Sequence, residues 1–218
     1  HATGIPVIPH GGMTGLAGGG NPRGGEIAIS LELLRGIEEI DTQAATMTVQ
    51  AGTPLEVCQQ AAADAGLYLA LDLGSRGSCQ IGGNLATNAG GNRVIRYGMA
   101  REQVLGLEAV LADGTIVTSL NKMLKNNAGF DLKQLFIGSE GTLGIITRAV
   151  LRLHPPPGDI TTVLCAVETY DDVVTLLRRA QGEAGGVVAF EALWRDYFTF
   201  TSEALGHHFF EGQQAFWV

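Results

Sequence analysis

Residues 77–92 read GSCQIGGNLATNAGGN, a glycine-rich stretch that contains no lysine or arginine. A second such stretch, PHGGMTGLAGG, occupies residues 9–19. Glycine makes up 31 of the 218 residues, about twice its usual share of roughly 7%. Glycine lets the backbone approach a ligand closely, and successive backbone N–H groups can then bind an anion without a charged side chain. The two stretches therefore predict a site for a large phosphorylated cofactor.

Either stretch alone could instead be a tight turn or a flexible linker. Apolar, strand-like residues adjoin both of them, at 5–8 and at 67–71, whereas a linker would be richer in serine and charge. The two common nucleotide motifs are absent. No Gly-Lys-Ser/Thr triplet of a Walker loop occurs, and Arg23 stands at the last glycine position of the G-x-G-x-x-G pattern that Gly18 and Gly20 begin.

Five segments follow one another in a fixed order, at residues 9–19, 71–91, 97–98, 110–114 and 135–147. In this order they resemble the FAD-binding domain of the vanillyl-alcohol oxidase type, also called the FAD-linked oxidase family. The most similar branch is that of the D-2-hydroxy-acid dehydrogenases, which includes D-2-hydroxyglutarate and D-lactate dehydrogenases. The resemblance is strong over about residues 5–157 and weaker over residues 158–218.

The resemblance implies an α+β fold in two domains. Residues 1–157 would be the FAD-binding domain, built of two α+β subdomains and lacking its N-terminal part. Residues 158–218 would be the truncated beginning of a ferredoxin-like α+β cap domain that binds substrate. The boundary coincides with Pro155-Pro156-Pro157-Gly158, which is the clearest break in the chain.

The resemblance also implies which residues hold FAD. Position His10 departs from the family, which often has arginine there, and Met13 stands where asparagine or glycine is common. Both stretches still offer backbone donors, so we expect binding to persist. The expected cofactor-binding residues are Gly11, Gly12, Met13, Thr14, Gly15, Gly77, Ser78, Ile81, Gly82, Gly83, Asn84, Thr87, Asn88, Gly90, Glu140 and Ile145.

We expect the FAD to be noncovalent. Several relatives attach FAD through a histidine in the first glycine stretch, and that position corresponds here to Thr14 rather than to His10. Cys79 is the remaining candidate for a covalent bond, although its spacing to Gly82-Gly83 does not match that of cysteine-linked relatives.

The reaction implied is oxidation of a D-2-hydroxy acid to a 2-oxo acid by hydride transfer to flavin N5. An external acceptor, whether a quinone, a cytochrome or an electron-transfer flavoprotein, would then take the electrons. Catalytic residues are unknown, and we expect them beyond residue 218. The alternatives are another FAD-linked enzyme, such as a sugar oxidase or a cell-wall precursor reductase, or a non-catalytic flavin-binding fragment.

Composition narrows the class of protein. The formal net charge is −8, and no basic stripe is present, so we expect no nucleic-acid partner. No apolar run approaches the roughly 18 residues of a membrane-spanning helix. We expect a cytoplasmic protein, with peripheral association with a membrane as the alternative. The three scattered cysteines form no disulfide framework, and we interpret His207-His208 as surface residues rather than metal ligands.

Several local elements can be predicted as well. Thr53 is expected to cap a helix that Pro54 begins and Gly66 ends. A hairpin is expected through Asp113-Gly114. Further strands are expected at 5–8, 27–31, 47–51, 143–153, 161–167 and 187–192, and further helices at 131–136, 171–184 and 194–205.

Overall fold

The computed structural model describes residues 2–206 and 214–218, and it separates into two units, His1–Pro157 and Gly158–Val218. The separation falls within the proline-rich segment 155–158. Both units mix helices with sheet, so the expected α+β class is confirmed.

An antiparallel sheet of five strands forms the centre of the first unit. Its spatial order is β3 (Ile37–Asp41), β4 (Thr46–Gln50), β7 (Ile145–Arg152), β5 (Val104–Val110) and β6 (Ile116–Ser119). β5 and β6 pair as a hairpin, as expected. The two strands are joined by residues 111–115, where a glycine takes a positive φ of 86°.

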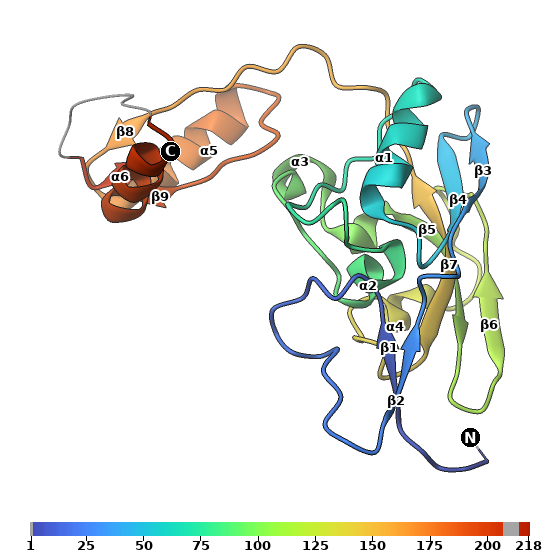
Figure 1. Ribbon diagram of the computed structural model, residues 1–218. Helices are drawn as coiled ribbons and strands as arrows, with labels where there is room; N and C mark the ends of the chain where they lie inside the picture. The colour runs from blue at the N-terminus through green and yellow to red at the C-terminus, as the bar shows by residue number, and fades with distance from the viewer. Residues whose placement is uncertain (1, 207–213) are drawn as a thin grey trace. The chain divides into compact units, whose positions relative to one another are not determined.

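The helices of the first unit cover one face of this sheet (Figure 1). They are α1 (Leu55–Asp64), α2 (Ile81–Ala86) and α4 (Lys133–Phe136), with α3 (Val94–Tyr97) and the 3-10 helix η1 (Ala100–Gln103) following α2. Because α2 contacts both β4 and β7, the second glycine stretch lies directly on the middle of the sheet.

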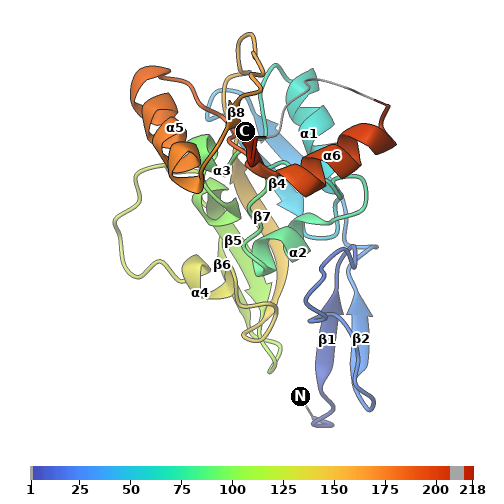
Figure 2. The same cartoon turned by 90° about the vertical axis from the view of Figure 1, so that its left-hand side faces the viewer.

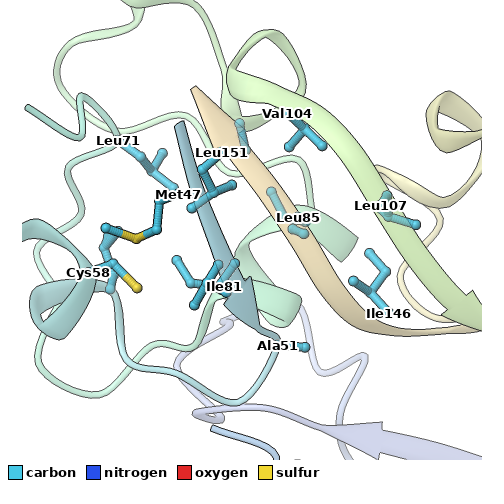
Figure 3. Close-up of a cluster of buried hydrophobic side chains, with 14 of the residues drawn as sticks. Met47, Ala51, Cys58, Leu71, Ile81, Leu85, Val104, Leu107, Ile146 and Leu151 are labelled. Atoms are coloured by element: carbon cyan, nitrogen blue, oxygen red, sulfur yellow. The ribbon is translucent and has the colours of Figure 1, made fainter. Parts of the chain in front are cut away.

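The core lies between these helices and the sheet. Figure 3 shows Met47 of β4 beside Cys58 of α1, with Ile81 of α2 and Ile146 of β7 in the same apolar layer. All four side chains are at most 4% exposed. Removing this apolar area from water holds the helices on the sheet, at about 25 cal/mol per Å².

A separate two-stranded parallel sheet precedes the large one along the chain. β1 (Val7–His10) pairs with β2 (Ile27–Ser30), and the first glycine stretch lies in the connection between them. Figure 2 shows the pair standing apart from the five-stranded sheet. A parallel pair requires a crossover connection, and here that connection carries the stretch toward α2.

Helix α1 ends as expected and begins differently. Gly66 has a φ of 73°, its N–H donates to the Ala63 carbonyl at 2.9 Å, and the next N–H donates to the Ala62 carbonyl at 2.8 Å, which is a Schellman ending. The expected cap by Thr53 is wrong. Its hydroxyl accepts the Gly36 N–H at 2.9 Å instead, so it joins two segments rather than capping the helix.

The second unit contains the segments β8 (Ala166–Val167), α5 (Tyr170–Glu183), β9 (Leu193–Trp194), α6 (Arg195–Ala204) and β10 (Phe216–Trp217). Its three strands form an antiparallel sheet in the order β8-β10-β9. Both helices agree with expectation. The strands expected at 161–167 and 187–192 are wrong in extent and position, because only two residues of each strand pair with β10.

No helix within the described ranges has the length and apolar character needed to cross a bilayer.

Candidate functional site

The two glycine stretches lie against each other. A Cβ on Gly12 would overlap the Ser78 carbonyl oxygen and would stand 2.8 Å from the Cys79 Cα. One residue earlier, a Cβ on Gly11 would lie 3.7 Å from the Gly83 Cα. Backbone therefore packs on backbone, and only glycine fits at Gly12, because any side chain there would push the stretches apart.

The second stretch is partly helical, and most of its leading amides are used within the protein. The N–H of Ile81 donates to Thr53 at 3.0 Å, and that of Gly82 donates to Ala51 at 2.7 Å. The Gly83 N–H has no acceptor in the described part of the chain, and this nitrogen faces Gly11. We expected both stretches to supply backbone donors to a ligand. In the first turn of α2, only the Gly83 N–H remains available for this among these three amides.

The first stretch is different, because its amides are free. None of the backbone N–H groups from residue 11 to residue 19 donates to an acceptor among the described residues. Residues 13–19 are exposed, so these donors are open to solvent and available to a ligand. The electrostatics of such a run suit an anion, and a diphosphate in particular.

Three side-chain atoms beside these stretches are buried without a partner in the described structure. They are His10 Nε2, Gln80 Oε1 and Asn84 Nδ2. Asn84 is only 5% exposed, and Gln80 Oε1 is 3.7 Å from where a Gly11 Cβ would stand. An unpaired buried polar group costs about 1–3 kcal/mol, so these atoms mark places where a polar ligand would be stabilising.

Of these three residues, sequence reasoning had named only Asn84 as a site residue. Gln80 was missed, although it lies between Ser78 and Ile81, and His10 was noted only as a departure from the family pattern. Neighbouring positions in the two stretches were the only signal available for either residue. Their burial depends on how the stretches pack, which the sequence pattern does not contain.

A third segment, residues 138–140, lies against the C-terminal end of α2. The N–H groups of Gly138 and Glu140 donate to the carbonyls of Leu85 and Ala86, at 3.0 and 2.8 Å. The Glu140 carboxylate reaches the first stretch, since its Oε2 lies 3.0 Å from where a Gly19 Cβ would stand. Glu140 is thus brought together with the glycine stretches, as its expected role requires.

Backbone conformation singles out three of the expected residues. Met13, Asn88 and Glu140 have φ angles of 52°, 48° and 52°, in the left-handed region. Ala45 is the only other non-glycine residue in the described ranges with a positive φ. Such residues are uncommon in folded proteins and cluster at ligand sites, where the surrounding structure holds them in place.

The remaining expected residues lie around these, with differing contacts. The Thr87 hydroxyl donates to the Gly83 carbonyl at 2.9 Å, so it is engaged within α2. A Cβ on Gly15 would meet nothing within 4 Å, whereas one on Gly90 would stand 3.1 Å from the Met99 sulfur. Thr14, Gly77 and Ser78 are exposed, and Ile145 begins β7 at the edge of the site.

The two arginines that border the second stretch share one carboxylate. Arg76 and Arg93 both pair with the buried Asp72, at 2.6 and 3.0 Å. Their charges are therefore directed toward Asp72 rather than toward the glycine backbone. Phosphate is often bound by cationic side chains, but neither glycine stretch contains a lysine or an arginine. We therefore expect backbone amide dipoles to bind a phosphate at this site.

Neither neighbouring cysteine is in a position to react. Cys79 is 2% exposed and lies in the apolar core with Cys58. Burial raises the pKa of the Cys58 thiol to about 12, so it stays protonated near neutral pH. No three His, Cys, Asp or Glu side chains among the described residues form a group that could hold a metal ion, and His207-His208 lie outside those residues.

The residues present fit FAD. The free amides of the first stretch suit its diphosphate. The missing side chains at Gly15 and Gly83 leave open space beside the backbone. The unpaired polar atoms offer both a donor and an acceptor. Every feature of the site lies within His1–Pro157.

This chain is similar to a family model, to curated proteins and to solved structures. Residues 1–119 match the family model of the FAD binding domain. The chain is 43% identical over 215 residues to D-2-hydroxyglutarate dehydrogenase of Xanthomonas citri pv. viticola, covering 99% of this chain and 44% of that protein. It is also 43% identical over 192 residues to the mitochondrial D-2-hydroxyglutarate dehydrogenase of Bos taurus, covering 88% of this chain and 35% of that protein. The chain thus spans less than half the length of these curated relatives.

Two solved structures of alkyldihydroxyacetonephosphate synthase have a similar fold. One aligns with a TM-score of 0.70 at 26% identity, over 82% of this chain and 32% of the other. The second aligns with a TM-score of 0.78 at 22% identity, over 99% of this chain and 39% of the other. This likeness supports the expected type of fold over both units.

Proposed function

Because the chain belongs to the family of FAD binding domains, we propose that its two glycine stretches hold FAD without a covalent bond. The packing of Gly12 on Ser78, beside the free amides of residues 11–19, is the observation that carries this proposal. Those amides bind the diphosphate, and the neighbouring Gly83 N–H adds a donor from the opposite stretch. Gln80 and Asn84 satisfy polar atoms of the cofactor from the buried side.

The protein of which this chain is part is proposed to oxidise a D-2-hydroxy acid to a 2-oxo acid. Relatives that are 43% identical are named D-2-hydroxyglutarate dehydrogenase, which supports this substrate class. FAD, when bound, supplies the two-electron redox chemistry. The residues of this chain bind and orient it.

The electron acceptor and the cellular compartment are proposed in general terms. The electrons pass to an external acceptor, for which a quinone, a cytochrome and an electron-transfer flavoprotein all remain candidates. We retain the cytoplasm as the proposed compartment, although the Bos taurus relative is named as mitochondrial.

Dye reduction by a protein extended to the length of its relatives tests this proposal. We expect reduction with at least one of D-2-hydroxyglutarate, D-lactate and glycolate, and none with the L-enantiomers of the chiral acids. The 218-residue chain with added FAD should show no turnover, because its described residues present no cation placed for a substrate carboxylate with a base beside it. D-specific turnover by the chain alone, or none by the longer protein, would contradict the proposal.

A further inference from the structure

Arg101 binds the end of α4 through its forked side chain. One terminal nitrogen donates to the Gln134 carbonyl at 2.9 Å and to the Gln134 side-chain oxygen at 2.6 Å. The other terminal nitrogen donates to the Ile137 carbonyl. Carbonyls at a helix C-terminus lack intrahelical partners, and a planar guanidinium can satisfy two of them at once.

All of these acceptors are neutral. No carboxylate in the described part of the chain forms an ion pair with Arg101, although seven such pairs occur elsewhere. The arrangement therefore serves geometry rather than charge neutralisation. A lysine would keep the charge here but could not reproduce the fork, because its ammonium is a single point donor.

The backbone of the same residue holds the end of α2. The Arg101 N–H donates to Asn88 Oδ1 at 3.0 Å, and the preceding Ala100 N–H donates to the Ala89 carbonyl at 2.8 Å. Asn88 has the left-handed φ of 48°, so this bond supports a conformation that is unfavourable for most residues. Arg101 thus joins the turn after α2 to the end of α4.

The segment that follows α4, residues 137–141, continues to the first glycine stretch. A Cβ on Gly141 would stand 2.6 Å from Pro9 Cγ, and the Glu140 carboxylate lies beside Gly19. This segment therefore lies against the two ends of the first glycine stretch, at Pro9 and Gly19. Its position depends on the carbonyl of Ile137 and on the two amide bonds to α2.

We propose that Arg101 is a positioning residue for the diphosphate of FAD. It fixes segment 137–141 against the first glycine stretch and so keeps the free amides there in a geometry that binds the diphosphate. This inference rests on the FAD site proposed above, and it requires no contact between Arg101 and the cofactor.

The test compares Arg101→Met and Arg101→Lys with the unchanged 218-residue chain. Three quantities are measured: the FAD dissociation constant, the ³¹P resonances of bound FAD, and the visible circular dichroism of the flavin at saturating FAD. Both variants should raise the dissociation constant about tenfold. This corresponds to the loss of one hydrogen bond between a backbone amide of the first stretch and the charged diphosphate. The ³¹P resonances should move toward those of free FAD, while the flavin dichroism keeps its shape.

Two further variants act as controls. Lys133→Met removes a salt bridge to Asp131 from the same short helix without touching η1, and it should leave all three quantities unchanged. Gln134→Leu removes one of the three acceptors and should shift them in the same direction by a smaller amount. It also keeps the test decisive if the Arg101 variants do not fold.

Unchanged FAD affinity and ³¹P resonances in Arg101→Met would overturn the proposal. So would a loss of flavin dichroism together with a lower unfolding temperature of the FAD-free chain, because that pattern reports general structural damage. If Arg101→Lys binds FAD like the unchanged chain in all three measurements, the charge of residue 101 is sufficient and its forked geometry is not needed. That result would also overturn the proposal. If the unchanged chain binds FAD but the longer protein oxidises no hydroxy acid, the proposed function fails and this inference stands. If the unchanged chain binds no FAD, both fail.

Discussion

Gly82 and Gly83 are neighbours in α2, and they differ in what surrounds them. A Cβ on Gly82 would stand 2.7 Å from the Ala51 Cβ, so this glycine lets α2 approach the sheet. A Cβ on Gly83 would meet nothing within 4 Å, and this residue faces Gly11 across the proposed site. Neither has a positive φ, so close approach rather than backbone freedom explains both glycines.

We therefore predict opposite effects of a methyl group at the two positions. Gly82→Ala should lower the free energy of unfolding by about 1–3 kcal/mol through overpacking. Gly83→Ala should leave that free energy unchanged or slightly higher, because alanine favours a helix by up to about 1 kcal/mol. It should nevertheless weaken FAD binding, since its methyl would occupy the space of the cofactor. Urea unfolding and FAD titration measure the two effects, and equal behaviour of the variants would contradict the assignment.

Whether FAD is bound covalently or noncovalently also depends on single residues. Thr14 occupies the position of the linking histidine in some relatives, and Cys79 is buried in the core at 2% exposure. We predict that acid precipitation of the FAD-loaded chain releases all flavin into the supernatant, where its absorbance is measured. If yellow colour remains with the pellet, the prediction is wrong, and Cys79→Ala then tests the remaining candidate.

At the scale of elements, the start of α1 shows how a tertiary contact can replace a local one. Thr53 has the residue type and the position of a helix cap. It is 2% exposed, however, and its hydroxyl accepts the Gly36 N–H at 2.9 Å and donates to the Gly36 carbonyl at 3.3 Å. The side chain thus fixes the segment before β3 against the segment that leads from β4 into α1.

This contact predicts the behaviour of two variants. Thr53→Val keeps the shape but leaves the Gly36 N–H and carbonyl without their partner, which should lower the free energy of unfolding by about 1–3 kcal/mol. Thr53→Ser keeps the hydroxyl and should be less destabilising. Urea unfolding of both variants provides the measurement, and wild-type stability of Thr53→Val would show that the contact contributes nothing.

Elements with strong local signals were predicted well. The Asp113-Gly114 hairpin, the left-handed Gly66 and the amphipathic pattern of α5 each depend on residues close in sequence. The strand containing β8 was predicted too long and β9 was misplaced, because each has only two residues and is defined by pairing with β10. β3, α2 and α3 were not foreseen, since their short segments have no strong period of their own.

At the scale of the whole molecule, the proposed site belongs to one unit. The glycine stretches, segment 137–141 and Arg101 all lie within His1–Pro157. The described contacts that hold the site together are those between β1, α2, η1 and the end of α4, which all belong to this unit. FAD binding should therefore be a property of the first unit.

We predict that residues 1–157 alone bind FAD with a dissociation constant within about twofold of that of the full chain. The reason is that no described hydrogen bond of the site leaves this unit. Fluorescence titration of FAD measures both constants, with the full chain as the control. Failure of residues 1–157 to bind FAD while the full chain binds it would mean that the second unit contributes to the site.

The sequence by itself was sufficient for the class of fold and for the kind of ligand. Glycine-rich backbone without cations is a local property, and so is the order of the motifs along the chain. Which amides remain free was decided only in the tertiary structure. The N–H groups of Ile81 and Gly82 are used by the carbonyls of Thr53 and Ala51, about thirty residues away. The burial of Gln80 and the reach of Arg101 to Ile137 likewise depend on packing between distant segments, because a hydrogen bond depends on distance in space rather than along the chain.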